Sequence, residues 1–192
     1  NTTQARTDRV SSLLLGLSGE VYRRVVAEST IQLDSQDYRP ERFNVGVRYQ
    51  PEIGKVLNLG YRFTTAALNP NPPTTGVAQE IRQIDISGQW PLGGRWYVVG
   101  RLNYSIPDRA ATESLAGLEY NGGCWIVRTV VQRFATSTTS TTNLFFVQLE
   151  LNGFAKIGSN PLEPLRRNIP GYSILGRNPV TQQPTDFALE TE

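Results

Sequence analysis

The feature of this sequence that most constrains its fold is an alternation of apolar and polar side chains along many short segments. Between residues 43 and 49, for example, Phe43, Val45 and Val47 are separated by polar residues or glycine. Successive side chains of a β-strand point to opposite faces of its sheet, so each such segment has one apolar and one polar face. The pattern predicts an all-β, antiparallel fold.

The alternating segments are long for strands. Most are close to the ~9 to 11 residues that a tilted strand needs to cross a bilayer, whereas strands of soluble proteins average about 5 to 6. The length favours an antiparallel transmembrane β-barrel. We count about nine segments of this kind, which start near Val10, Val21, Arg42, Lys55, Glu80, Arg95, Glu113, Cys124 and Asn143.

The connections between these segments alternate in length. Short turns with Gly are predicted at residues 18–20, 50–54, 91–94 and 121–123, and long polar connections at residues 34–41, 65–79, 106–112 and 135–142. Bacterial barrels have short turns on the periplasmic side and longer loops outside. The first segment then starts outside and the last ends inside. Because complete barrels have an even number of strands, the odd count predicts the C-terminal part of a larger barrel.

Composition excludes several function classes. With 39% hydrophobic residues, the sequence contains no apolar run near the ~20 residues that a spanning helix requires. Nineteen basic residues against 17 acidic ones give a net charge of +2, so no basic surface for nucleic acid is expected. There is no His and one Cys, which removes the usual zinc ligands and the Ser-His or Cys-His nucleophiles. We expect neither enzymatic activity nor a metal or other cofactor.

The polar face of the segments would line the lumen of a barrel, where it meets water, a plug protein or a lipid head group. For each residue on this face, a solvated wall position is the ordinary role. The lumen-facing candidates are Arg48, Arg62, Asp85, Arg101, Glu119, Arg128 and Glu150. Aromatic residues near segment ends suit interfacial girdles; they are Tyr49, Phe63, Trp90, Trp96, Tyr104, Tyr120 and Trp125.

The last alternating segment divides the chain into two parts. Residues 1–152 are predicted to be barrel strands, and residues 153–192 a periplasmic or lumenal tail in which Pro161, Pro164 and Pro170 prevent a continued strand. Residues 176–192 are polar and are predicted to form a flexible end. On the last segment, the residues of the apolar register are Asn143, Phe145, Val147, Leu149 and Leu151.

Four stretches carry a more specific resemblance. They are WPLGGRWYVVGRLNY (residues 90–104), LEYNGGCWIVR (118–128), FFVQLELNGF (145–154) and LRRNIPGY (165–172). Together they resemble the carboxyl end of the LptD family of lipopolysaccharide-assembly translocons, over most of residues 42–172. The hairpin with Cys124 and the tail with Arg167, Asn168, Ile169 and Pro170 are the specific part, since alternation alone matches any outer-membrane barrel.

The resemblance implies a large barrel in the outer membrane of a Gram-negative bacterium, with its C-terminus in the periplasm. Such a protein receives lipopolysaccharide from the periplasmic bridge protein LptA through an N-terminal jellyroll domain. It encloses the plug lipoprotein LptE, and the barrel-assembly machinery inserts it. Lipid leaves sideways between the first and last strands. A lipid can leave there only where the pairing of these strands is weak enough to open, which makes residues 143–152 the candidate gate strand.

The resemblance also bears on Cys124. Relatives of this type carry two neighbouring cysteines at this hairpin, bonded to cysteines of the N-terminal domain, and here Gly123 occupies one of those positions. A single long-range disulfide from Cys124 is therefore our hypothesis, in keeping with an oxidising periplasm. The alternative is a free Cys that acts as a small buried hydrophobic residue.

Three other functions stay open at this point. A porin or other diffusion channel shares the strands, but would normally end at its last strand and needs no periplasmic Cys. A barrel enzyme, such as a lipase or protease, would lack the common Ser-His pair. A soluble β-sandwich or β-helical adhesin is compatible with the alternation, because one strand face could pack on a core instead of meeting hydrocarbon.

Overall fold

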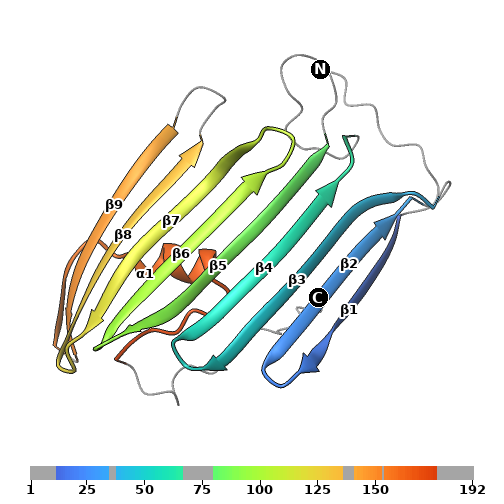
Figure 1. Cartoon of the computed structure of the whole chain (residues 1–192). Coiled ribbons are helices and arrows are strands. Elements are labelled where there is room, and N and C mark those ends of the chain that lie inside the picture. The colour runs from blue at the N-terminus through green and yellow to red at the C-terminus, as the bar shows by residue number, and fades with distance from the viewer. Residues whose placement is uncertain (1–11, 35–37, 67–79, 136–140, 153, 177–192) are drawn as a thin grey trace, which may run out of the picture.

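The strands form an open, twisted wall (Figure 1). The computed structural model describes residues 12–34, 38–66, 80–135, 141–152 and 154–176. In this part of the chain, ten strands build one antiparallel sheet in which each strand pairs with its neighbours in sequence. The elements are β1 (Leu13–Tyr22), β2 (Val25–Leu33), β3 (Pro40–Glu52), β4 (Lys55–Thr64), β5 (Ile81–Gly93), β6 (Trp96–Ser105), β7 (Ala110–Asn121), β8 (Trp125–Ala135), β9 (Thr141–Leu151), β10 (Ala155–Gly158) and α1 (Leu162–Asn168).

The register sorts the side chains onto two faces as the alternation predicts. Val47 on β3 pairs with Leu59 on β4, and Leu59 pairs with Ile86 on β5; all three lie on what we call the outward face and are at least 41% exposed. The other face, which carries residues such as Arg48 and Asp85, is the inward face. An apolar face left uncovered by protein is what a wall in contact with hydrocarbon requires. The predicted all-β, antiparallel barrel wall is confirmed.

The β1–β2 hairpin differs from its prediction. The sequence predicted a turn at residues 18–20 because of Gly19, whereas β1 continues to Tyr22 and the chain turns at residues 23–24. Arg24 adopts the left-handed conformation (φ 67°), and its amide donates a 2.9 Å hydrogen bond to the Glu20 carboxylate. A hydrogen bond from a neighbouring side chain thus supports the turn, and Gly19 remains in the strand.

The connection between β6 and β7 is also shorter than predicted. Residues 106–112 were expected to form a long loop, but β7 already begins at Ala110, so only residues 106–109 connect the strands. The Ser105 hydroxyl donates a 2.6 Å hydrogen bond to Asp108, and Arg109 takes a positive φ of 50°. These local interactions close a tight turn. The sequence of residues 106–112 did not predict it, because it contains no Gly.

The short turns at residues 23–24, 53–54, 94–95 and 122–124 lie at one end of the wall, which we call the turn end. The strand ends that flank residues 34–39, 65–80, 106–109 and 136–140 lie at the opposite end of the wall, which we call the loop end. Apart from the β6–β7 turn, the predicted alternation of short and long connections is retained.

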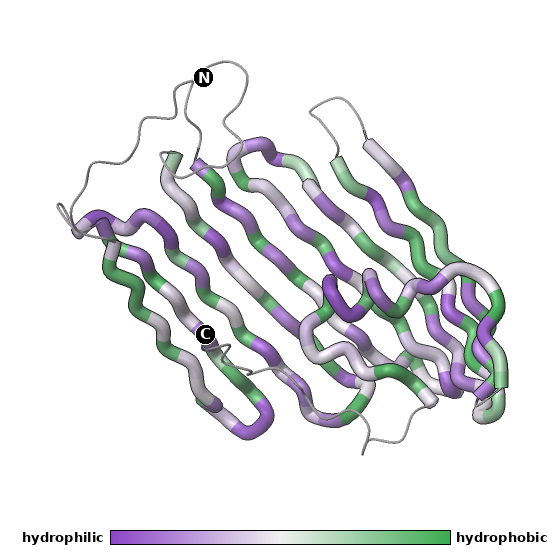
Figure 2. Tube along the Cα trace, turned by 180° about the vertical axis from the view of Figure 1, so that it is seen from behind, coloured by the Kyte–Doolittle hydropathy of each residue, from purple (hydrophilic) through white to green (hydrophobic). Residues whose placement is uncertain are grey.

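The chain after β9 contains two elements that the sequence did not predict, β10 and α1. The following segment, together with α1, lies across the inward face of the sheet (Figure 2). We call residues 161–176 the inward tail. Pro164 fits α1 because it lies in the first helical turn, where its missing N–H would have no helical partner. Between tail and wall lies a small core of Val56, Val99, Leu115, Val130, Leu165 and Ile169, each at most 3% exposed. No helix in the described residues is long and apolar enough to span a membrane.

Gly117 on β7 lies opposite Val99 and Val130 in this core, so it offers a test of the packing. A Cβ at Gly117 would come within 2.9 Å of side-chain atoms of both valines and within 2.6 Å of the Thr129 carbonyl oxygen. We expect Gly117→Ala to lower the free energy of unfolding by about 1 to 3 kcal/mol, as overpacking does. Urea unfolding of the full-length protein in detergent micelles measures this.

The matched control is Gly100→Ala on β6, where the nearest atom to a new Cβ is a carbonyl oxygen at 3.6 Å. This variant should keep the stability of the parent or exceed it slightly. Equal losses for the two variants would contradict the packing described here.

Candidate functional site

The inward face brings the predicted lumen-facing residues into two charged groups. In the first, the Arg101 guanidinium lies 2.7 Å from the Asp85 carboxylate and 3.4 Å from that of Glu113. In the second, Arg128 lies between Glu119 and Glu150. Arg48 and Arg62 stand apart from both groups, on β3 and β4: the Arg48 Nε donates to Asn58 at 3.2 Å, and Arg62 is exposed.

Arg128 is the centre of the second group. Its guanidinium is fully buried and lies 3.1 Å from Glu119 Oε1, 2.6 Å from Glu150 Oε2 and 3.1 Å from Gln148 Oε1. A buried guanidinium needs such partners, since an uncompensated charge removed from water is strongly destabilising. Arg128 therefore joins β7, β8 and β9 through side chains as well as through the backbone ladder.

The same group binds the inward tail. The Tyr172 hydroxyl donates a hydrogen bond to Glu119, which also accepts one from the Gln89 amide at 2.9 Å. Gln89 in turn pairs with the backbone of Ser173, accepting from its N–H at 2.9 Å and donating to its carbonyl at 3.1 Å. The polar groups of β5 and β7 thus form a docking site for residues 172–173.

Further bonds fix the tail on both sides of this point. The Arg101 guanidinium donates to the Asn168 side chain, and Asn58 Nδ2 donates to the Pro170 carbonyl at 2.9 Å. Arg128 also donates to the Leu175 carbonyl at 3.4 Å. Three of the predicted lumen-facing residues, Arg101, Glu119 and Arg128, therefore bind the chain's own tail. The alternation of side chains could not indicate this contact. Glu119 was singled out from the sequence. Alternation placed Gln89 and Gln148 on the same polar face without distinguishing them from its other residues, and Ser173 carried no signal.

The pKa of the Tyr172 phenol is raised well above its ordinary value of 10.0, first because burial disfavours the phenolate and second because Glu119 lies beside it. A raised pKa means that the docked tail holds the phenolic proton more tightly than the unfolded chain does. The contribution of this contact to stability is complete below pH 10 and is lost as the pH rises through the folded-state pKa.

We therefore expect the phenolate absorbance difference between the parent and Tyr172→Phe to appear well above pH 10 in the folded protein. In the denatured protein the same difference should appear near pH 10. An alkaline absorbance titration of both variants measures this. A difference near pH 10 in the folded state would mean that Tyr172 is not buried against Glu119.

The predicted gate strand β9 forms the second part of the site. Asn143, Phe145, Val147, Leu149 and Leu151 all lie on its outward side, and Phe145 is 68% exposed. On one edge β9 pairs with β8 along its whole length, from Thr141 to Leu151. On the other edge, β10 pairs with residues 148–151 alone. The part of this edge nearer the loop end has no strand partner within the described residues.

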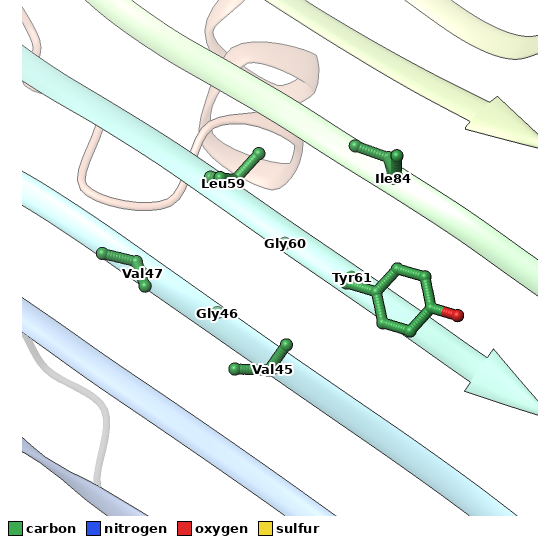
Figure 3. Close-up of a pocket in the computed structure, with 7 residues that line it drawn as sticks. All are labelled: Val45, Gly46, Val47, Leu59, Gly60, Tyr61 and Ile84. Carbon is green, nitrogen blue, oxygen red and sulfur yellow. The ribbon is translucent and has the colours of Figure 1, made fainter.

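The outward face has the features of a membrane surface. Near the turn end, Tyr120 packs against Trp96 and Trp125, with ring centroids 4.8 and 5.0 Å apart, in the position predicted for an interfacial girdle. Farther along the wall, the side chains of β3, β4 and β5 leave a shallow depression (Figure 3). It is lined by Val45, Gly46, Val47, Leu59, Gly60, Tyr61 and Ile84. Its lining is almost wholly apolar, so hydrocarbon can fill it without loss of hydrogen bonds.

Cys124 lies in the turn between β7 and β8 and is exposed. The alternative of a small buried hydrophobic residue therefore does not hold for Cys124. Its long-range disulfide stays a prediction. Among the described residues, no group of three or more Cys, Asp or Glu side chains is arranged to hold a metal ion.

Comparison with known proteins identifies the family. The sequence model of the protein family LptD, described as LPS transport system D, matches residues 1–96, which is half of the 192-residue chain. This chain belongs to the LptD family. It is 46% identical over 167 residues to the LPS-assembly protein LptD of Azoarcus sp. (strain BH72), covering 87% of this chain and 20% of that protein. The corresponding proteins of Aromatoleum aromaticum and Thiobacillus denitrificans are 45% and 44% identical over 167 residues, again 87% of this chain and 20% and 21% of theirs.

The resemblance predicted from the sequence is therefore confirmed. The chain spans about a fifth of the length of these LptD relatives. Two features of the described structure are therefore candidates for a functional role. One is the inward face with its bound tail, and the other is the edge of β9 that β10 pairs only in part.

The Arg128 group gives a test of tail docking. Arg128→Ala leaves Glu119 and Glu150 without their buried partner, and we expect a loss of about 3 to 5 kcal/mol in unfolding free energy. The control is Arg167→Ala, which removes an exposed pair with Glu163 and should change stability by less than about 0.5 kcal/mol. Urea unfolding in micelles measures both values. Equal small losses would show that the tail does not depend on Arg128.

Proposed function

We propose that this chain is the closing part of an outer-membrane translocon that inserts lipopolysaccharide into the outer leaflet. Lipid leaves through a lateral opening between the first and last strands of the complete barrel, and β9 is the last strand. The observation that carries the proposal is an LptD-family wall whose β9 edge lacks a strand partner, among the described residues, over the half nearer the loop end. An edge with few backbone hydrogen bonds is the place where a wall opens at least cost.

The orientation and partners belong to the same proposal. The turn end faces the periplasm and the loop end faces the cell exterior, in the outer membrane of a Gram-negative bacterium. Residues 153–192 lie on the lumenal and periplasmic side. The complete protein receives lipopolysaccharide from LptA, encloses LptE and is inserted by the barrel-assembly machinery. Its role is transport, without a catalytic step.

A diffusion channel is the second candidate, but one observation disfavours it. The inward tail packs on the inward face of β4, β6, β7 and β8 in a small apolar core, and its Ser173 binds Gln89 of β5. A water-filled channel uses its polar wall to solvate solutes. Here polar side chains of that wall bind the inward tail instead, as Gln89 does at Ser173 and Asn58 at Pro170.

The function can be tested with a photoreactive amino acid at two positions of β9 and β8 in the full-length protein. Leu144 lies at the half-paired edge on the inward side and is 40% exposed; Val131 lies on the outward side and is 46% exposed. We expect lipopolysaccharide adducts at Leu144 only while transport proceeds, because lipid reaches that side only on its way out.

Val131 is the matched control, since it faces the membrane and its adducts should persist when transport is stalled. An absence of lipopolysaccharide at Leu144 in transporting cells would contradict the proposal. Together with steady ion conductance of the purified protein in planar bilayers, that outcome would favour the diffusion channel.

A further inference from the structure

We propose that β10 is a built-in cover for the edge of β9 near the turn end, so that the first strand of the complete barrel pairs with β9 over residues 141–146 alone. The inference rests on the proposed function, because it specifies where along the wall the lateral opening lies. It follows from the pairing of β10, which no pattern in the sequence predicted.

The contacts between β10 and β9 are those of a regular antiparallel ladder. Ala155 pairs with Leu151, Lys156 with Glu150, Ile157 with Leu149 and Gly158 with Gln148. Ser159 extends the contact by one residue: its N–H donates to the Val147 carbonyl, and the Val147 N–H donates to the Ser159 hydroxyl, both at 2.9 Å. The backbone groups of β9 that would bind another strand are therefore occupied from Val147 to Leu151.

The side chains of β10 continue the pattern of the wall. Ile157 is on the outward side with Leu149 and is 61% exposed, as an apolar residue facing hydrocarbon would be. Lys156 is on the inward side, and its ammonium lies 3.6 Å from the Glu150 carboxylate, which Arg128 also binds. Like the longer strands, β10 therefore has an apolar side chain on the outward face and a charged one on the inward face.

A strand has only two edges, and β8 occupies one edge of β9 throughout. With β10 on part of the other edge, residues 141–146 are left for the first strand. At about 3.4 Å per residue, this gives a seam of roughly 20 Å, on the side of the loop end. In the proposed orientation the loop end is outermost, so the seam lies where lipid enters the outer leaflet, while the periplasmic part stays covered.

Gly158 provides a specific way to remove β10. It has a positive φ of 101°, and a Cβ there would lie 2.2 Å from the Val147 carbonyl oxygen. Gly158→Ala must therefore displace β10 from β9. Gly93 is the matched control, since its φ is 104° but a Cβ at that position would have no atom within 4 Å, so Gly93→Ala shares the backbone strain without the collision.

The test uses cysteine pairs in the full-length protein in cells. Leu149→Cys with Ile157→Cys places two thiols on directly paired residues, within the range that a disulfide bridges. Phe145→Cys with Ile157→Cys is the control, because residue 145 lies four residues, or about 13 Å, farther along the same face. Trypsin cleaves after Lys156 and separates the two halves of either pair, so mass spectrometry identifies the linked peptides directly.

We expect roughly tenfold more linked peptide from the 149/157 pair than from the 145/157 pair, given the strict geometry of disulfides. Adding Gly158→Ala should reduce the link severalfold, whereas adding Gly93→Ala should not. If the 149/157 pair does not link in the complete barrel, or if the 145/157 pair links equally well, the proposal is wrong.

The last readout is transport. Because β10 stays in place while lipid leaves farther along β9, the linked 149/157 protein should deliver lipopolysaccharide to the cell surface at the rate of the same protein after reduction. Loss of delivery on linking would overturn the inference. The proposed function fails by a different result, the absence of transport-dependent adducts at Leu144.

Discussion

The central constraint on this molecule is that hydrocarbon offers no hydrogen-bond partner to a peptide group. Strands β2 to β8 meet the constraint through a neighbour on each side, whereas β9 has a full-length neighbour on one side only. β9 meets it on one side with β8 and, near the turn end, on the other side with β10. Residues 141–146 of its second edge have no strand partner within the described residues.

The inward tail depends on the same wall. Its docking combines a small apolar core, in which Leu165 and Ile169 meet Val99 and Val130, with hydrogen bonds to polar side chains of the inward face. Arg128 connects the tail to β9, since its guanidinium donates hydrogen bonds to the Leu175 carbonyl and to the Glu150 carboxylate. Glu150 also approaches Lys156 of β10. The inward tail, β9 and β10 are therefore connected through shared contacts, and a substitution in one of them should affect the others.

In the function that we propose, this arrangement has a purpose. A translocon for an amphipathic lipid needs an opening that admits acyl chains sideways without exposing the whole height of the wall. A half-paired last strand meets this need, because fewer backbone bonds have to separate. The covered inward face near the turn end suits the same task, since it leaves less of the lumen open to small solutes.

The sequence by itself determined the all-β fold and the two faces of the wall, because a strand's alternation is local and each segment carries it independently. The family followed from something else, the particular residues of stretches such as 118–128 and 165–172. The sequence placed Arg48, Arg101 and Arg128 on one face because of the same alternation. It missed the turn at Arg24, β10 and the partners of Arg128, since these depend on contacts that alternation does not encode. Tyr172 meets Glu119 across 53 positions. Only the assembled sheet brings such groups together. The tertiary structure alone therefore decided that the charged residues of the inward face bind the tail and that β10 pairs with only part of β9.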